Sequence, residues 1–176
     1  MFLDRDGVIN YALSHNGVPS APLTLAEFQL LSGVTDALHR LRDAGFLLIV
    51  VTNQPDVARG HASRQEVETV HARLREMLPL DDIRVCYHDD CDRCACRKPA
   101  PGMLYAAAVE REIALGQSYL VGDRWRDIEA GHRAGCTTIL VDSGHGEPAT
   151  IEPDIRMRDL DHAARWIVSR AQRLPR

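Results

Sequence analysis

No stretch of this sequence stays apolar for the roughly 20 residues that a membrane-spanning helix needs. The longest apolar run, residues 46–51, has the length of a strand. Basic residues are not in excess either, since 21 lysines and arginines face 25 acidic residues and the formal charge is −4. These deficits argue against a membrane span and against a nucleic acid or an anionic membrane as partner.

Internal repeats and low-complexity tracts are also lacking. No signal peptide is visible, because the chain opens through Met1-Phe2-Leu3 straight into Asp4. We therefore expect a cytoplasmic protein. The length of 176 residues suits a single domain, residues 1–176, and we expect a monomer. Only three residues precede Asp4, so either the first strand is very short or the sequence starts a few residues late.

Cysteines are few and unevenly placed: the chain has five, and four of them fall within residues 86–96. Scattered disulfides would not cluster in this way, so we expect a reducing compartment and a metal site. Cys86 and His88, with Cys94 and Cys96, supply the ligand types and number of a closed tetrahedral Zn²⁺ site. Cys91 could replace Cys94 as a ligand. We favour a set without Cys91, because Cys86-x-His88 and Cys94-x-Cys96 form two pairs of the same spacing and together a compact clasp. The competing interpretation is a set of free thiols.

Apolar runs alternate with segments of helical period along the chain. Strand candidates are residues 46–51, 83–87, 119–121 and 137–141, and helix candidates are 34–45, 63–78, 101–108, 127–134 and a last helix capped by Asp161. This alternation predicts a Rossmann-like three-layer α/β/α fold with a mainly parallel sheet. Residues 10–32 lack a clear period and should form a loop over the site. No insertion is long enough for a large cap domain.

Polar motifs fall at the ends of the predicted strands. Asp4 and Asp6 lie two residues apart after the first apolar run, so both can reach one site at the carboxyl edge of a sheet. One carboxylate can attack while the other moves a proton. The later motifs are Thr52-Asn53, Arg97-Lys98 and Gly122-Asp123. Each alone would be an ordinary turn, but a hydroxyl, an amide, a lysine and a further acid together suit phosphoryl transfer with Mg²⁺.

The set Asp4-Arg5-Asp6-Gly7, Thr52-Asn53, Lys98 and Gly122-Asp123-x-x-x-Asp127 resembles the four motifs of the haloacid dehalogenase superfamily of phosphatases. The resemblance implies that Asp4 is a nucleophile that forms an aspartyl-phosphate. It implies that Asp6 first protonates the leaving oxygen and then deprotonates the attacking water. Thr52 and Lys98 would steady the phosphoryl group, and Asp123 would hold Mg²⁺ with Asp4 and the main-chain carbonyl of Asp6.

The cysteine clasp resembles the branch of this superfamily that contains the D-glycero-D-manno-heptose 1,7-bisphosphate phosphatases and the histidinol-phosphate phosphatases. Residues 52–60 and 96–103 favour the heptose side. Four residues are then expected to bind substrate: Asn53, Gln54, Arg97 and Arg124. Arg124 is a departure, because a lysine often stands at this position in the family.

We therefore expect a Mg²⁺-dependent phosphomonoester hydrolase with a structural Zn²⁺ and a small phosphorylated metabolite as its partner. The leading substrate is D-glycero-D-manno-heptose 1,7-bisphosphate, hydrolysed at its 7-phosphate. The alternatives within this class are histidinol phosphate and other small sugar phosphates. A zinc-stabilised module that binds phosphorylated ligands without turnover is a hypothesis of another class. Asp4 and Asp6 argue against it, because a binder gains little from two acids beside a phosphate.

Overall fold

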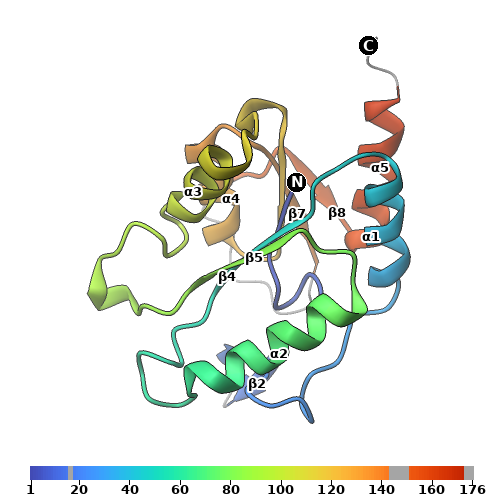
Figure 1. Cartoon of the computed structure of the whole chain (residues 1–176). Helices are drawn as coiled ribbons and strands as arrows, with labels where there is room; N and C mark the ends of the chain where they lie inside the picture. Colours follow the sequence, from blue (N-terminus) through green and yellow to red (C-terminus); the bar gives the residue numbers. More distant parts are fainter. Residues whose placement is uncertain (16–17, 143–150, 173–176) are drawn as a thin grey trace.

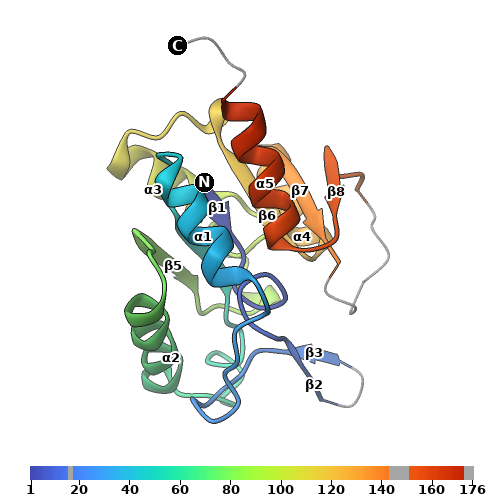
Figure 2. The ribbon, with the colours of Figure 1, turned by 90° about the vertical axis from the view of Figure 1, so that its right-hand side faces the viewer.

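A six-stranded parallel sheet forms the centre of the molecule, in the order β5-β4-β1-β6-β7-β8 (Figures 1 and 2). The structure is a computed structural model that describes residues 1–15, 18–142 and 151–172. The strands are β1 (Phe2–Leu3), β4 (Ile49–Asn53), β5 (Asp82–Cys86), β6 (Tyr119–Gly122), β7 (Thr137–Val141) and β8 (Ile155–Met157). The prediction of a mainly parallel sheet is confirmed.

Helices cover both faces of this sheet, which confirms the three-layer α/β/α prediction. They are α1 (Val34–Asp43), α2 (Arg64–Met77), α3 (Gly102–Arg111), α4 (Trp125–Ala134) and α5 (Leu160–Ala171). Successive strand residues face opposite sides. Helices α1 and α5 lie on one side of the sheet and α3 and α4 on the other (Figure 2). Leu3 packs with the apolar faces of α1 and α5, whereas Phe2 packs with those of α3 and α4. Among the described residues, no helix combines the length and apolar character needed to cross a membrane.

Strand β1 is only two residues long, yet it lies at the centre of the sheet. Leu3 is paired with Val50 of β4 on one side and with Val121 of β6 on the other. The Asp4 amide still donates to the Val121 carbonyl, at 2.9 Å. Asp4 therefore leaves the sheet at its carboxyl edge, between two neighbouring strands whose own ends carry polar motifs.

The strand expected at residues 46–51 begins later, at Ile49, and continues to Asn53. Thr52 and Asn53 therefore end the strand instead of following it. The shift has a local cause, because Leu48 is held by Asp81 before the ladder begins. Its amide donates to the Asp81 carboxylate at 2.7 Å, and its carbonyl accepts from the Asp81 amide at 2.9 Å.

Two other expectations are corrected by the structure. The region 10–32 is not wholly a loop, since β2 (Leu13–His15) and β3 (Val18–Ser20) form an antiparallel hairpin there. The last helix is capped by Asp159, whose carboxylate accepts from the His162 amide at 2.9 Å. Asp161 lies inside the first turn of α5 and pairs with Arg40 instead.

Candidate active site

Three carboxylates meet beyond the carboxyl ends of β1 and β6. Asp4 follows β1, Asp123 follows β6, and Asp127 lies in the first turn of α4. All three are buried, and each offers a carboxylate oxygen within 4.8 Å of the others. Lys98, which is also buried, places its Nζ 2.8 Å from Asp4 Oδ1 and forms a second ion pair with Asp127. Such a set of hard oxygen donors is suited to Mg²⁺.

The acids of this cluster outnumber its cations, since Lys98 pairs with both Asp4 and Asp127, while Arg124 Nε lies 3.9 Å from Asp123. Burial and the neighbouring Asp127 raise the pKa of Asp4 to about 7, although Lys98 works in the opposite direction. Burial alone would lower the pKa of Lys98, but the attraction of Asp127 and Asp4 outweighs it and the pKa is raised. The raised pKa of Asp4 reflects the cost of ionising one more carboxyl group here, a cost that a divalent cation would reduce.

Asp6 has a separate environment from these three acids. Its carboxylate accepts from Arg5 Nε at 3.1 Å, Arg5 Nη2 at 3.0 Å, Asn10 Nδ2 at 2.9 Å and Gln54 Nε2 at 2.8 Å. Burial opposes ionisation of Asp6, but the Arg5 guanidinium and these hydrogen bonds prevail and lower its pKa. The group of potential metal-binding carboxylates does not include Asp6. Its carboxylate is therefore held apart from the proposed metal ligands, with its oxygens facing donors of the protein.

Residues 52–54 were predicted to contact phosphate or substrate, and in the structure their side chains also bond to other residues of the protein. The Gln54 amide donates to Asp6 Oδ2 and, at 2.9 Å, to Thr52 Oγ1. Asn53 lines the pocket, but its side chain bonds both the amide and the carbonyl of Lys98, at 3.1 and 3.0 Å. Among the described residues, Thr52 and Gln54 are absent from the pocket lining. Gln54 orients Asp6, because a hydrogen bond to an ionised carboxylate is stronger than one between neutral groups.

A pocket of about 620 Å³ opens over Asp4 and Asp6. The region of the hairpin contributes Ser20, Ala21 and Leu23 to its wall. Four arginines also line it: Arg59, Arg97, Arg124 and Arg126. We call these four side chains the arginine wall. The predicted substrate residues Arg97 and Arg124 thus both reach the pocket, and the wall offers guanidinium groups to an anionic ligand beside the acids Asp56 and Asp90 that share the lining.

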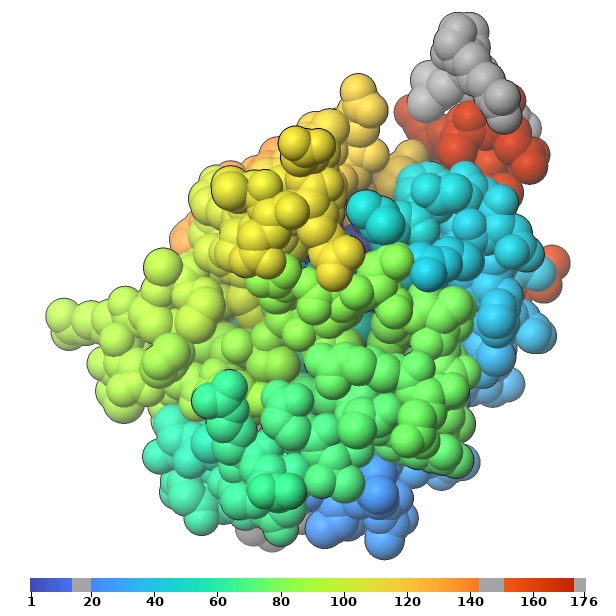
Figure 3. Space-filling view, in the orientation of Figure 1, coloured from blue at the N-terminus to red at the C-terminus, as the bar shows by residue number. Residues whose placement is uncertain are grey.

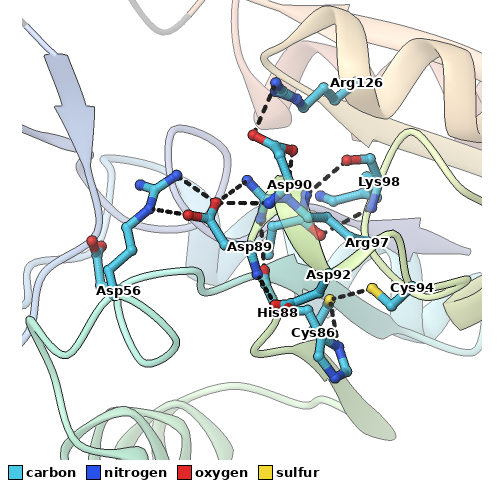
Figure 4. Close-up of polar contacts among 12 residues, drawn as sticks. Asp56, Cys86, His88, Asp89, Asp90, Asp92, Cys94, Arg97, Lys98 and Arg126 are labelled. Atoms are coloured by element: carbon cyan, nitrogen blue, oxygen red, sulfur yellow. Dashed lines mark hydrogen bonds and ion pairs between the residues drawn. The ribbon is translucent and has the colours of Figure 1, made fainter.

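Acidic residues of a short 3-10 turn, η1 (Asp90–Asp92), and its cap Asp89 hold much of this wall in place (Figure 4). Asp89 receives two bonds from Arg59, at 2.8 and 2.7 Å. Asp90 accepts from Arg97 at 2.8 Å and lies 3.7 Å from Arg126, which extends from α4. The turn therefore presents arginines from three separate segments of the chain to one pocket.

The four predicted zinc ligands lie together in the same loop (Figure 4). The sulfurs of Cys86, Cys94 and Cys96 are 3.1 to 3.6 Å apart, and His88 Nδ1 lies 3.3 Å from Cys96 Sγ. Sulfurs bound at 2.3 Å to a tetrahedral zinc would be roughly 3.8 Å apart, so the set fits a zinc ion with little adjustment. Cys91 is exposed and lies outside the group. The loop protrudes from the rest of the molecule at the left of Figure 3.

Some site residues were not assigned a role from the sequence. Asp127 was visible as the second acid of the Gly122-Asp123-x-x-x-Asp127 motif, and its pairing with Lys98 gives the reason for its presence. Arg126 carried no signal, because a lone arginine in a helix is usually a solvated surface residue. Arg5 would also have been placed at the surface, yet its side chain is fully buried.

Comparisons with known proteins agree with this geometry. Residues 95–163 match the protein family described as "HAD-hyrolase-like". The chain is 39% identical over 152 residues to the D-glycero-beta-D-manno-heptose-1,7-bisphosphate 7-phosphatase of Pseudomonas putida, covering 84% of each sequence. It is 35% identical over 188 residues to the enzyme of the same name from Escherichia coli K12, covering 99% of this chain and 91% of the relative.

A solved structure gives the same result. The D,D-heptose 1,7-bisphosphate phosphatase from B. bronchiseptica, complexed with magnesium and phosphate, superposes with a TM-score of 0.81 and 31% identity. The match covers 97% of this chain and 98% of that one. The sequence relatives, the fold and the arrangement of acids around Lys98 agree, and the chain belongs to the haloacid dehalogenase-like hydrolases, as a phosphatase of that family.

Proposed function

We propose that this phosphatase hydrolyses a small sugar bisphosphate, with D-glycero-D-manno-heptose 1,7-bisphosphate as substrate and its 7-phosphate as the group removed. The relatives that carry this name match the chain over most of its length. The observation that carries the proposal is the arginine wall above Asp4 and Lys98. A substrate with two phosphates can place one against Asp4 while the wall binds the other.

The arrangement supports a two-step reaction. Asp4 attacks the phosphorus atom, and the bond to the sugar oxygen breaks as Asp6 gives that oxygen a proton. The resulting aspartyl-phosphate is then attacked by a water molecule, whose proton passes to Asp6, and inorganic phosphate leaves. Lys98 stabilises the negative charge beside the Asp4 oxygen throughout. The low pKa of Asp6 rises when a phosphate dianion comes close, which lets it carry a proton at that moment.

We propose Mg²⁺ as the catalytic cofactor, held by the carboxylates of Asp4 and Asp123 and by the main-chain carbonyl of Asp6. When bound, the ion would reduce the repulsion between the nucleophile and an anionic phosphate. Asp127 has a different part, because it holds Lys98. Thr52, whose hydroxyl accepts from Gln54, would steady the phosphoryl group together with Lys98.

We propose a structural Zn²⁺ at Cys86, His88, Cys94 and Cys96. Four protein ligands leave no open position for substrate, so the ion would hold the loop and not take part in the reaction. Such a site needs reduced thiols, which favours the cytoplasm as the location.

Phosphate release from matched substrates tests the proposal. The enzyme is assayed with heptose 1,7-bisphosphate, heptose 7-phosphate and histidinol phosphate, with and without Mg²⁺. We expect the largest kcat/KM for the bisphosphate and a loss of at least about a thousandfold in kcat for Asp4→Asn. An Asp4→Asn enzyme that kept most of its activity would exclude the aspartyl-phosphate route.

The arginine wall has its own variant test. Arg126→Ala should raise KM for the bisphosphate roughly tenfold and leave KM for the monophosphate nearly unchanged, because a single charged hydrogen bond is worth about 1.5–3 kcal/mol. Arg73→Ala is the matched control, since Arg73 pairs with Glu76 on an exposed part of α2. Equal KM changes for the two substrates would assign Arg126 a role other than recognition of the second phosphate.

A further inference from the structure

Arg5 is a charged side chain without any exposed surface, so its partners determine where it lies. Its Nε and Nη2 atoms donate to the Asp6 carboxylate. Its Nη1 atom lies 2.9 Å from Nε2 of His71, a residue of α2 that is also fully buried. A residue 66 positions away in the sequence therefore holds the outer end of the guanidinium that faces Asp6.

The direction of the Arg5–His71 bond follows from the chemistry of the two groups. A guanidinium stays protonated in proteins and can only donate. His71 must accept at Nε2, and its ring is then neutral with the proton on Nδ1. The positive charges of Arg5 and Arg75 oppose protonation of the ring, whereas Glu68 favours it. Glu68 Oε1 lies 3.6 Å from Nδ1, which is longer than a hydrogen bond. Burial and Arg5 lower the pKa of His71 to about 4.

We propose that His71 is a positioning residue that acts through Arg5 to aim the carboxylate of Asp6 at the leaving oxygen. The inference rests on the proposed role of Asp6 as acid and base. A proton donor must lie within hydrogen-bond reach of the atom it serves. Arg5 supplies two of the groups that fix the Asp6 carboxylate, so its own orientation sets that reach. Without His71, Nη1 would be a buried donor with its partner removed, and the guanidinium would turn to find another.

Helix α2 is itself anchored on the side that carries His71. The hydroxyl of Tyr87 donates to Glu68, and Tyr87 lies between the two clasp residues Cys86 and His88. Tyr87 thus ties the clasp to α2 through Glu68, three residues before His71. This bond helps to hold the helix that carries His71 in place relative to the clasp.

The test compares two substrates that differ in their need for a proton. A sugar phosphate has a poor leaving group that must be protonated, whereas p-nitrophenyl phosphate releases an anion that is stable near neutral pH. His71→Leu removes the acceptor and fills the buried position with an apolar side chain of similar size. We expect it to lower kcat/KM for the sugar phosphate by tenfold to about a hundredfold, and to affect p-nitrophenyl phosphate far less. His71→Gln can still accept from Arg5 and should recover most of the loss.

Three further proteins make the result decisive. Leu74→Ala, one turn along α2 in the apolar core, should lower stability and leave the ratio of the two kcat/KM values unchanged. His71→Asn replaces the leucine variant should that protein not fold, since asparagine is too short to reach Arg5. Asp6→Asn is the reference for a lost proton donor. An unchanged ratio in His71→Leu, or in His71→Asn where it takes its place, with a changed ratio in Asp6→Asn, overturns the role of His71 alone. An unchanged ratio in Asp6→Asn overturns the proposed role of Asp6 itself.

Discussion

At the scale of single residues, a neutral histidine buried beside an arginine should make the protein less stable in mild acid. The pKa of His71 is about 4 in the folded chain, compared with about 6.5 when unfolded. Between these values the unfolded chain binds the proton and the folded chain does not, so the free energy of unfolding decreases as pH falls from 6.5 towards 4. The loss at pH 5 should be about 2 kcal/mol for this residue.

Urea unfolding of the wild type and of His71→Gln, at pH 7 and at pH 5, measures this contribution. The variant should lose less stability between the two pH values than the wild type does, because glutamine does not titrate. Other titrating groups are common to both proteins and cancel in the comparison. The same decrease in both proteins would show that His71 is already protonated, or accessible to protons, in the folded state.

Gly122 gives a second prediction at this scale, because the structure leaves no room for a side chain at its position. A Cβ atom at this position would lie 2.1 Å from Asp127 Cβ and 2.6 Å from Asp127 Oδ2. Gly122→Ala should therefore push Asp127 away from Lys98 and lower kcat/KM at least about tenfold. In Gly116→Ala, no described atom lies within 4 Å of the added Cβ, so activity and Tm should be unchanged. Assays and thermal unfolding of both variants check the contrast.

The sequence could predict which residues lie at the site better than it could predict what each one touches. Asp4 and Asp123 were placed together by a general rule, because parallel strands bring their carboxyl ends to one edge, and Lys98 was added by the resemblance to the family's motifs. Gln54 was assigned to substrate, but its amide meets Asp6. That contact joins two loops 48 residues apart, and no local pattern reports it.

At the scale of elements, the errors lie where a tertiary contact replaces a local preference. Strand β8 was not predicted, since Ile155–Met157 has an exposed middle residue and no continuous apolar run. It forms because it adds to β7 at the sheet edge, where only one side needs a partner. The central strands were predicted with small shifts, because burial on both faces leaves an apolar run that the sequence displays.

The cap of α5 gives a prediction at this scale. Asp159 accepts from the His162 amide, and although burial works against it, this bond and the His162 ring lower the pKa of Asp159 to about 2. The folded pKa is thus below the unfolded value, so the stabilisation is complete above about pH 4 and is lost as pH falls towards 2. Asp159→Ala should cost about 1 kcal/mol at pH 7 and less at pH 3, whereas Asp159→Asn should keep most of the cap. Urea unfolding at the two pH values measures both.

At the scale of the whole molecule, one loop connects the metal clasp, the nucleophile and the pocket wall. Lys98 follows Cys96 by two residues and pairs with Asp4, which lies near the N-terminus. Asp89 and Asp90, between the two halves of the clasp, hold Arg59 and Arg126 from other segments. Ordering this loop therefore sets the positions of both the phosphoryl-binding lysine and the arginine wall.

Loss of the proposed zinc clasp should accordingly lower stability, zinc content and substrate affinity together. Two cysteines of the same loop, one inside the clasp and one outside it, allow a matched comparison. Cys94 belongs to the clasp, whereas Cys91 is exposed and outside it. We expect roughly one zinc per chain in the wild type and in Cys91→Ser, with similar Tm and KM. Cys94→Ser should lose zinc, unfold at lower temperature and bind the bisphosphate more weakly, because metal binding contributes to the folding of such loops. Elemental analysis, thermal unfolding and KM for the two variants form one experiment.

A Cys94→Ser protein that lost zinc but kept its KM would show that the arginine wall is ordered without the clasp. A Cys91→Ser protein that also lost zinc would show that Cys91 is a ligand.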